Sequence, residues 1–332
     1  MDIFLNALLL IGCFVVLIKG ADFMVDSASF IAKALKVPAV VIGLTIVAFG
    51  TSAPEAGVSI ASSLSGQNSL SISNVVGSNC FNLLVVVGLC AAIRSMNIDK
   101  DIKKRDYPIC IGFSALLCLF VFDKTISRVE GLIFFALIVG YCVLLIAVTM
   151  NGNNIKDSVT SESADDKDDK ETGKVKPGKI IFHLLVVVAS ITAIYFSSKG
   201  IVYSCSFFAK LLGISDTIIG LTIVALGTSL PELVTSIVAS RKGENGIALG
   251  NVVGSNIFNI TFVLGIAAAI SPLSINSENI IDAFICLALT AVCALFIFTG
   301  KKVKRGEGVA MLLMYAAYMV FVFMREFGAL PF

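Results

Sequence analysis

The chain has 332 residues, of which 57% are hydrophobic and only 14% are charged. Soluble domains carry about 25% charged residues, so this composition excludes an ordinary soluble globular protein and indicates a membrane protein. The net charge of +2 gives no reason to expect a nucleic-acid partner. Met1 and Asp2 lead into apolar sequence without a basic region, so we expect the first segment to be a retained span rather than a cleaved signal peptide.

Ten apolar segments are long enough to cross a bilayer, which takes about 20 helical residues. In chain order they cover residues 3–32, 38–65, 69–93, 107–122, 129–149, 179–209, 215–240, 246–270, 279–299 and 307–325. The first and sixth are longer than usual, which predicts tilted or kinked helices. The sequence therefore predicts an all-α polytopic membrane protein with ten transmembrane helices.

The fifth and sixth segments are separated by residues 151–178, which are rich in Asp, Lys, Ser and Gly. Such a stretch buries too little apolar surface to fold alone, so we interpret it as a flexible linker. It contains an acidic run from Asp165 to Asp169 that lacks the spacing and the glycine of a calcium loop. The predicted organisation is a first five-helix half at 1–150, the linker at 151–178, and a second five-helix half at 179–332.

Basic residues predict the orientation, because cytoplasmic loops carry an excess of Lys and Arg. If the N-terminus lies outside, 19 of the 25 basic residues fall inside and four fall outside. We therefore expect both termini outside and the linker in the cytosol, in a multi-pass protein of the cell (inner) membrane. The expected surroundings are membrane lipid, and the expected assembly is a monomer.

Two sequence motifs each occur twice. Gly43–Glu55 reads GLTIVAFGTSAPE and Gly220–Glu232 reads GLTIVALGTSLPE, with 11 of 13 positions identical and an offset of 177 residues. The same offset relates Asn74–Leu83 to Asn251–Ile260, with eight of ten positions identical. Five spans separate the copies, so the two copies run through the membrane in opposite directions. This predicts two inverted-topology repeats of five helices, a plan of many secondary transporters whose site lies near the midplane.

The polar side chains of these motifs recur at helical spacing, so those within one span share a face. They are Thr51, Ser52, Glu55, Ser78 and Asn82 in the first half, and Thr228, Ser229, Glu232, Ser255 and Asn259 in the second. Sites built only from oxygen suit calcium, magnesium, manganese or alkali ions. The alternative for Glu55 and Glu232 is a structural carboxyl paired with a hydroxyl, but an ionisable residue deep in a span favours a functional role.

Pro54 and Pro231 lie inside the first motif, and each removes a hydrogen bond to the carbonyl four residues earlier. The freed carbonyls of Gly50 and Gly227 would need a partner at membrane depth, and a cation is suitable. Two ionised glutamates give the site a charge of −2, which one calcium ion neutralises and three sodium ions exceed by one. Binding of calcium therefore displaces sodium, and binding of sodium displaces calcium. Protons could also compete for the glutamates, because burial raises the pKa of a carboxyl group.

Two signatures, G-T-S-x-P-E in both halves and G-N-x-x-G-S-N in the second half, resemble the cation/calcium exchanger superfamily, specifically its prokaryotic sodium/calcium exchanger branch. The first half departs from the second signature, with Ser73 in place of its first glycine. The resemblance implies a secondary active antiporter, not an enzyme, that exchanges sodium for calcium by alternating access at a central site and uses no cofactor. It implies shared carboxylates at Glu55 and Glu232, sodium-site hydroxyls at Ser52, Ser229, Ser78 and Ser255, central amides at Asn82 and Asn259, and ligand carbonyls at Ala48, Thr51, Ala225 and Thr228. The neutral Asn259 argues against potassium dependence.

Three alternatives remain open on these residues. The first is a proton/calcium exchanger on the same fold, and the second is an ion channel. The third is an intramembrane enzyme, although the chain has no H-E-x-x-H motif, no P-loop and no serine–histidine pairing around its lone His183. The nine cysteines lie in or beside apolar segments without a C-x-x-C pair, so we expect small buried hydrophobic residues rather than a disulfide or metal framework.

Overall fold

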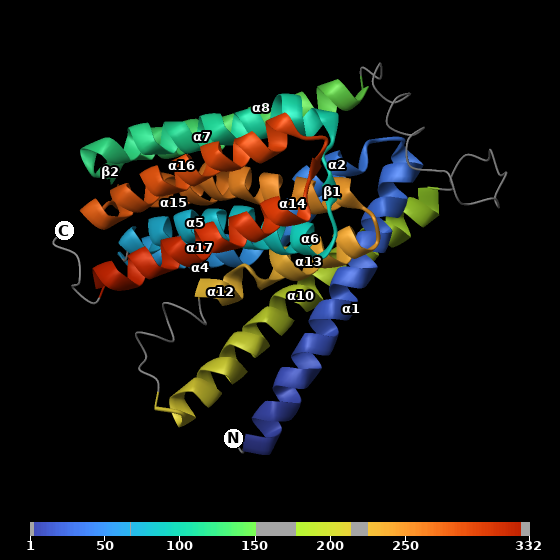
Figure 1. Cartoon of the computed structure of the whole chain (residues 1–332), viewed down its shortest axis with the longest axis horizontal. Helices are drawn as coiled ribbons and strands as arrows, with labels where there is room; N and C mark the ends of the chain where they lie inside the picture. Colours follow the sequence, from blue (N-terminus) through green and yellow to red (C-terminus); the bar gives the residue numbers. More distant parts are fainter. Residues whose placement is uncertain (1–2, 67, 151–176, 214–224, 327–332) are drawn as a thin grey trace.

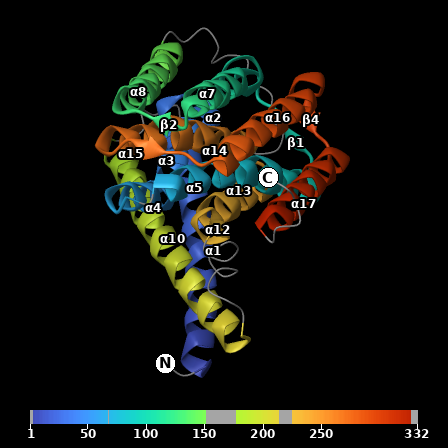
Figure 2. The ribbon, with the colours of Figure 1, turned by 90° about the vertical axis from the view of Figure 1, so that its left-hand side faces the viewer.

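The computed structural model describes residues 3–66, 68–150, 177–213 and 225–326. These residues are almost entirely helical. Two long helices, α1 (Ile3–Leu35) and α10 (Pro177–Leu211), lie side by side and project from the rest of the bundle (Figures 1 and 2). Their close approach depends on glycine, because a Cβ on Gly20 would lie 3.0 Å from the Ile194 side chain. Small residues of this kind let membrane helices pack against one another.

The other helices of the first half contain several short breaks. They are α2 (Ala39–Ile42), the π-helical η1 (Gly43–Val47), α3 (Ala48–Thr51), α4 (Ala53–Leu64), α5 (Asn68–Phe81), the π-helical η2 (Asn82–Val86), α6 (Val87–Ile93), the π-helical η3 (Ile102–Asp106), α7 (Tyr107–Phe120), the 3-10 turn η4 (Val121–Asp123) and α8 (Arg128–Met150). The described helices of the second half, besides α10, are α12 (Ala225–Thr228), α13 (Leu230–Arg241), α14 (Asn245–Phe258), the π-helical η6 (Asn259–Val263), α15 (Leu264–Ile270), α16 (Ser277–Thr299) and α17 (Arg305–Glu326).

Within the described residues, eight helices are long and apolar enough to cross a membrane. A ninth span results if the pair at Ala39–Thr51 and Ala53–Leu64, which bends by 46°, is counted as one broken helix. The bend lies just ahead of Pro54, which removes a helical hydrogen bond and kinks the chain. The predicted span at 215–240 includes residues 215–224, which lie outside the described part of the chain, as do residues 151–176 of the predicted linker.

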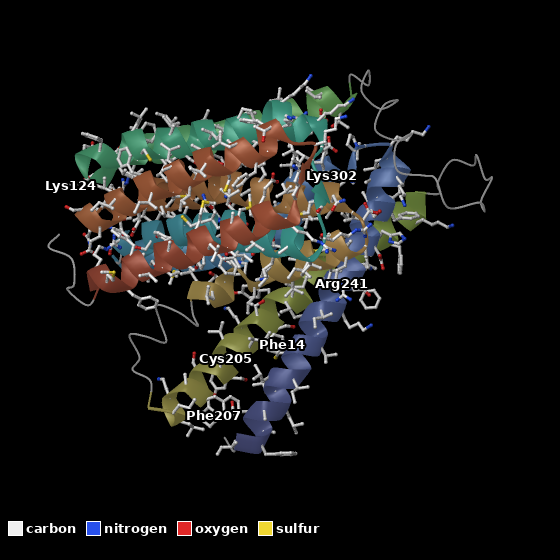
Figure 3. The ribbon with its side chains drawn as sticks, in the orientation of Figure 1. Phe14, Lys124, Cys205, Phe207, Arg241 and Lys302 are labelled. Atoms are coloured by element: carbon white, nitrogen blue, oxygen red, sulfur yellow. The ribbon has the colours of Figure 1, made fainter. Side chains whose placement is uncertain are left out.

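Equivalent elements recur in the two halves at the 177-residue offset of the sequence motifs. Adding 177 to the bounds of α5, η2 and α6 gives the bounds of α14, η6 and α15. Two short antiparallel strand pairs, which the sequence did not predict, each join the two halves: β1 (Met96–Asn97) with β4 (Lys302–Val303), and β2 (Thr125–Ile126) with β3 (Leu273–Ser274). Lys124, beside β2, and Lys302, in β4, lie at opposite ends of the bundle (Figure 3). The halves are therefore tied together at both ends.

The helix α14 packs tightly against the first half of the chain. A Cβ on Gly254 would lie 2.8 Å from the Cα of Leu44, and one on Gly250 would lie 2.7 Å from the carbonyl oxygen of Val40. Only glycine permits this contact between backbones. The second copy of the Asn-Val-Val-Gly-Ser-Asn motif is thereby held against the segment that leads into Glu55.

Candidate ion-binding site

Glu55 and Glu232 occupy matching positions just after a helix break. Glu55 lies in the first turn of α4, after Ser52 (φ −81°, ψ 5°), and Glu232 lies in the first turn of α13, after Ser229 (φ −92°, ψ 6°). Proline is tolerated there because the first helical N–H groups have no intrahelical partner. Both glutamates have no exposed surface. The breaks therefore place two carboxyl groups at helix N-termini, where the helix dipole favours negative charge.

The serines at the two breaks bind the glutamates crosswise. Ser52 Oγ donates to Glu232 Oε1 at 3.0 Å, and Ser229 Oγ donates to Glu55 Oε1 at 3.1 Å. Each bond joins residues of different halves, 180 and 174 positions apart in the chain. The two copies of the first motif therefore meet in the interior of the bundle, as their duplication predicted.

The second motif completes the contacts of each carboxylate. Ser78 Oγ donates to Glu55 Oε1 at 3.4 Å, and Ser255 Oγ donates to Glu232 Oε1 at 3.3 Å. Ser78 also lies 3.1 Å from Ser229, hydroxyl to hydroxyl. Both carboxylates thus accept one serine from each half through a single oxygen.

The threonines and alanines of the predicted set lie beside the breaks. Thr51 Oγ1 donates to Asn251 Oδ1 at 2.9 Å and contacts the Ala48 carbonyl oxygen at 3.3 Å. That carbonyl also accepts the Ser52 N–H at 3.0 Å. Thr228, half-buried, ends α12, and Ala225 begins it. The predicted positions therefore cluster around the two helix breaks.

The second oxygen of each glutamate has no hydrogen-bond partner among the described residues. These atoms are Glu55 Oε2 and Glu232 Oε2, and the side-chain oxygens of the fully buried Asn82 and Asn259 share this condition. Buried polar atoms normally have partners, since leaving one unpaired is costly. Four unpaired hard oxygens on the duplicated motifs match the ligand chemistry of calcium and alkali ions.

The two asparagines are not equivalent. Asn259 Nδ2 donates to Asn79 Oδ1 at 3.1 Å, which fixes which side of its amide carries the free oxygen. Neither polar atom of the Asn82 side chain has a hydrogen bond to a described residue. The halves therefore share positions but differ in how firmly the central amide is held.

Two further asparagines, Asn74 and Asn251, bind the backbone of the helices that carry the glutamates. Spacing within one helix could not reveal these contacts, because each one joins two helices. Asn251 Nδ2 donates to Ser236 Oγ at 3.0 Å and to the Glu232 carbonyl oxygen at 3.4 Å. Asn74 makes the matching contacts with Ser59 Oγ, at 3.1 Å, and with the backbone of Glu55, at 3.4 Å. These side chains fix the backbone that carries each carboxylate.

Soft or nitrogen ligands play no part in the described site. All nine cysteines are free thiols, and six of them are buried. Among the described residues no group of three or more His, Cys, Asp or Glu side chains could hold a metal. His183 instead contacts Ser27 Oγ at 3.1 Å and stacks on Phe30.

The sequence matches a known family twice. Residues 5–147 and residues 182–324 both match the sodium/calcium exchanger protein family, and the two matched segments begin 177 positions apart. The chain is 38% identical to the sodium/calcium exchanger MaX1 of Methanosarcina acetivorans, over 96% of this chain and 98% of the relative. It is 31% identical to the inner membrane protein YrbG of Escherichia coli strain K12, over 93% of each protein.

A solved structure of the sodium-calcium exchanger NCX_Mj has a similar fold. The TM-score is 0.81 at 26% sequence identity, and the match covers 96% of this chain and 99% of that one. The same exchanger solved without sodium or calcium matches equally well, with a TM-score of 0.81. This chain is therefore a membrane protein of the sodium/calcium exchanger family, within the prokaryotic branch of the cation/calcium exchanger superfamily.

Proposed function

We propose that the chain is a secondary active antiporter that exchanges sodium for calcium across the membrane. The observation that carries this proposal is the pair of buried carboxylate oxygens, Glu55 Oε2 and Glu232 Oε2, that bond to no described residue. An uncompensated charge at this depth is costly, and a bound cation removes the cost. MaX1 and NCX_Mj are named as sodium/calcium exchangers, which supports these two ions as the cargo.

The proposed ligand set consists of oxygens from both halves. Calcium takes about six to eight oxygen ligands, and sodium is also bound by hydroxyls and carbonyls. The side-chain ligands are Glu55, Glu232, Ser52, Ser229, Ser78, Ser255, Asn82 and Asn259, and the backbone ligands are the carbonyls of Ala48, Thr51, Ala225 and Thr228. A serine hydroxyl has one donor and two acceptor positions. Ser52 can therefore keep its bond to Glu232 while offering a lone pair to an ion.

The charge of the site explains why bound calcium and bound sodium exclude each other. With both glutamates ionised, the site has a charge of −2, which one calcium ion balances. Three sodium ions exceed it by one charge and use the same carboxylates. Ligand sharing therefore couples the departure of one ion to the arrival of the other, as exchange requires.

The architecture proposed around this site is ten transmembrane helices in two inverted repeats, residues 1–150 and 179–332, which alternately expose the site to either side. The common offset of elements and of family matches supports the repeat. The linker at 151–178 would be cytosolic and both termini outside, in agreement with the distribution of basic residues. The name of YrbG supports the inner membrane as the location. We propose a monomer in lipid, because each half supplies the partners of the other half's carboxylate.

Calcium-45 uptake into proteoliposomes tests the proposed exchange. Vesicles loaded with sodium and diluted into sodium-free medium should accumulate calcium, and vesicles without a sodium gradient should not. A pH gradient in the absence of sodium should drive no uptake. Uptake driven equally well by the pH gradient would instead assign proton/calcium exchange, and single-channel currents would assign a pore.

A further inference from the structure

An apolar groove of about 570 Å³ lies between α7 and α8, and none of the residues that line it belongs to the candidate ion site. Figures 1 and 2 place these helices together at one edge of the bundle. Small residues make the hollow, since Gly112 and Ala115 line it from α7 and Ala136 and Gly140 line it from α8. Because both helices cross the membrane, the groove opens toward lipid.

Most of the small residues that line the groove are not kept in the second half of the chain. At the 177-residue offset, Gly112 corresponds to Leu289 of α16, and Ala136 corresponds to Leu313 of α17. Ala115 likewise corresponds to Val292, whereas Gly140 corresponds to the small Ala317. Bulkier side chains thus stand at three of the four positions, although the ion-site motifs are kept in both halves.

The length of the groove matches one leaflet of a bilayer. Along α7 it runs from Ile109 to Leu119, which is about 15 Å at 1.5 Å per residue. The hydrocarbon core of a bilayer is about 30 Å thick. A single acyl chain lying along the helices would therefore fill it.

The segment at one end of the groove, residues 99–106, has four basic and three acidic side chains, so it carries a net charge of +1. Arg105 precedes Ile109 by one helical turn, about 6 Å, and the neighbouring Lys104 is exposed. Asp106 holds the Arg105 guanidinium through Nε at 2.7 Å and Nη2 at 3.0 Å, and Tyr141, whose ring lines the groove, donates its hydroxyl to Asp106 at 3.1 Å. A guanidinium has five donors, so Arg105 is fixed at the groove's end with donors to spare.

We propose that this groove binds one anionic glycerophospholipid, with an acyl chain along α7 and α8 and the phosphate at Lys104 and Arg105. Basic pockets between membrane helices are suited to such headgroups. A second copy of the chain fits less well. In a two-fold dimer the same surface meets itself, so two copies would bring their Lys104 and Arg105 side chains together at one membrane face. An anionic headgroup offsets that charge instead.

Fluorescence quenching tests the proposal directly, because the chain contains no tryptophan. Leu119→Trp places a single indole at the far end of the groove, where Leu119 is 70% exposed. Leu295→Trp on α16, where Leu295 is 60% exposed, is the matched control. Each variant is reconstituted in phosphatidylcholine with a small fraction of either phosphatidylglycerol or phosphatidylcholine brominated in the acyl chain.

The groove variant should distinguish the two brominated lipids, and the control should not. Brominated phosphatidylglycerol should quench the indole of Leu119→Trp more effectively than brominated phosphatidylcholine, by about fivefold for each basic residue engaged. The indole of Leu295→Trp should show no preference.

Two further substitutions separate headgroup from groove. Lys104→Gln in the Leu119→Trp background should reduce the preference for phosphatidylglycerol about fivefold. Gly140→Phe should abolish it by filling the groove, since a Cβ at Gly140 meets no described atom within 4 Å. Gly12→Phe on α1, where a Cβ is equally unobstructed, should leave the preference unchanged.

Equal quenching of the Leu119→Trp variant by both brominated lipids overturns the proposal, because it indicates ordinary surrounding lipid. So does a phosphatidylglycerol preference that survives both Lys104→Gln and Gly140→Phe. Absence of quenching by either lipid, together with a dimer in light scattering, would assign the groove to a second copy of the chain. The measurement needs no transport, so its failure is distinct from failure of the proposed exchange.

Discussion

Asn79 and Asn256 each donate a side-chain hydrogen bond to the other's backbone carbonyl, at 3.3 and 3.2 Å. They occupy the same position of the second motif in the two halves, 177 residues apart. The exchange of identical bonds resembles the crosswise contacts of Ser52 and Ser229 with the opposite glutamates. Most contacts of the ion-site region are thus reciprocal, and the bond from Asn259 to Asn79 is an exception because Asn82 makes no matching bond to a described residue.

Replacing either glutamate by glutamine should abolish calcium transport. Glu55→Gln or Glu232→Gln removes one of the two charges while preserving the size of the side chain. Loss of one partner of a buried charge interaction costs about 3–5 kcal/mol, or a factor of about 100 or more in calcium affinity. The measurement is sodium-driven calcium-45 uptake, with Glu278→Gln, an exposed carboxylate at the start of α16, as the control. Wild-type rates in either buried variant would exclude the carboxylates as ligands.

An additional carboxylate should affect the two central asparagines differently. Asn259→Asp replaces the Nδ2 donor to Asn79 with an acceptor, which leaves two oxygens facing each other at about the observed 3.1 Å. Loss of this bond should lower the free energy of unfolding by about 1–3 kcal/mol, besides changing ion dependence. Asn82→Asp breaks no bond to a described residue and should cost less stability. Thermal unfolding in detergent and uptake under sodium and potassium gradients measure both effects, and equal melting temperatures for the two variants would contradict this account.

Calcium and sodium should each stabilise the folded protein, but not additively. A ligand at about 100 times its dissociation constant stabilises by about 2.7 kcal/mol. Because both ions are proposed to use Glu55 and Glu232, sodium added to calcium-saturated protein should raise the melting temperature little further. Chelation of calcium in choline buffer should lower it. Fully additive shifts would indicate separate sites for the two ions.

Gly254→Ala should destabilise the protein although alanine is the better helix former. The helical preference favours alanine by about 1 kcal/mol, but the new Cβ would lie 2.8 Å from both Cα and O of Leu44. Overpacking of this kind costs about 1–3 kcal/mol, and backbone atoms cannot move aside as a side chain can. The melting temperature should therefore fall for Gly254→Ala and not for Gly12→Ala. An unchanged melting temperature for Gly254→Ala would mean that the two helices are free to separate.

The sequence predicted the eight or nine spans found in the described residues, and it singled out the two buried glutamates, for physical reasons. A run of about 20 apolar residues is typical of a transmembrane helix. An ionisable carboxyl such as Glu55 inside that helix is unfavourable in free energy unless a partner stabilises it. The duplication then indicated that Glu232 would be its neighbour. None of these inferences needed knowledge of contacts between distant helices.

Other features depend on such contacts and left no local pattern. Two-residue strands are too short for alternation of polar and apolar residues to be recognised. Lys242 binds Asp22 and Asp26, each at 2.6 Å, across more than 200 residues of chain. Helical spacing predicts a shared face for Thr51 and Glu55 only in an unbroken helix. The helix instead breaks at Ser52, between them. Periodicity therefore identified the polar residues but not their partners.

The strand pairs β1–β4 and β2–β3 have a consequence for the covalent connection between the halves. Each pair joins one half to the other, and the carboxylates are satisfied by serines from the opposite half. Self-complementary contacts of this kind are those of a two-fold homodimer. The two halves of one chain therefore meet through contacts of the kind that join the subunits of a two-fold dimer, and these contacts hold the halves together in addition to the covalent chain.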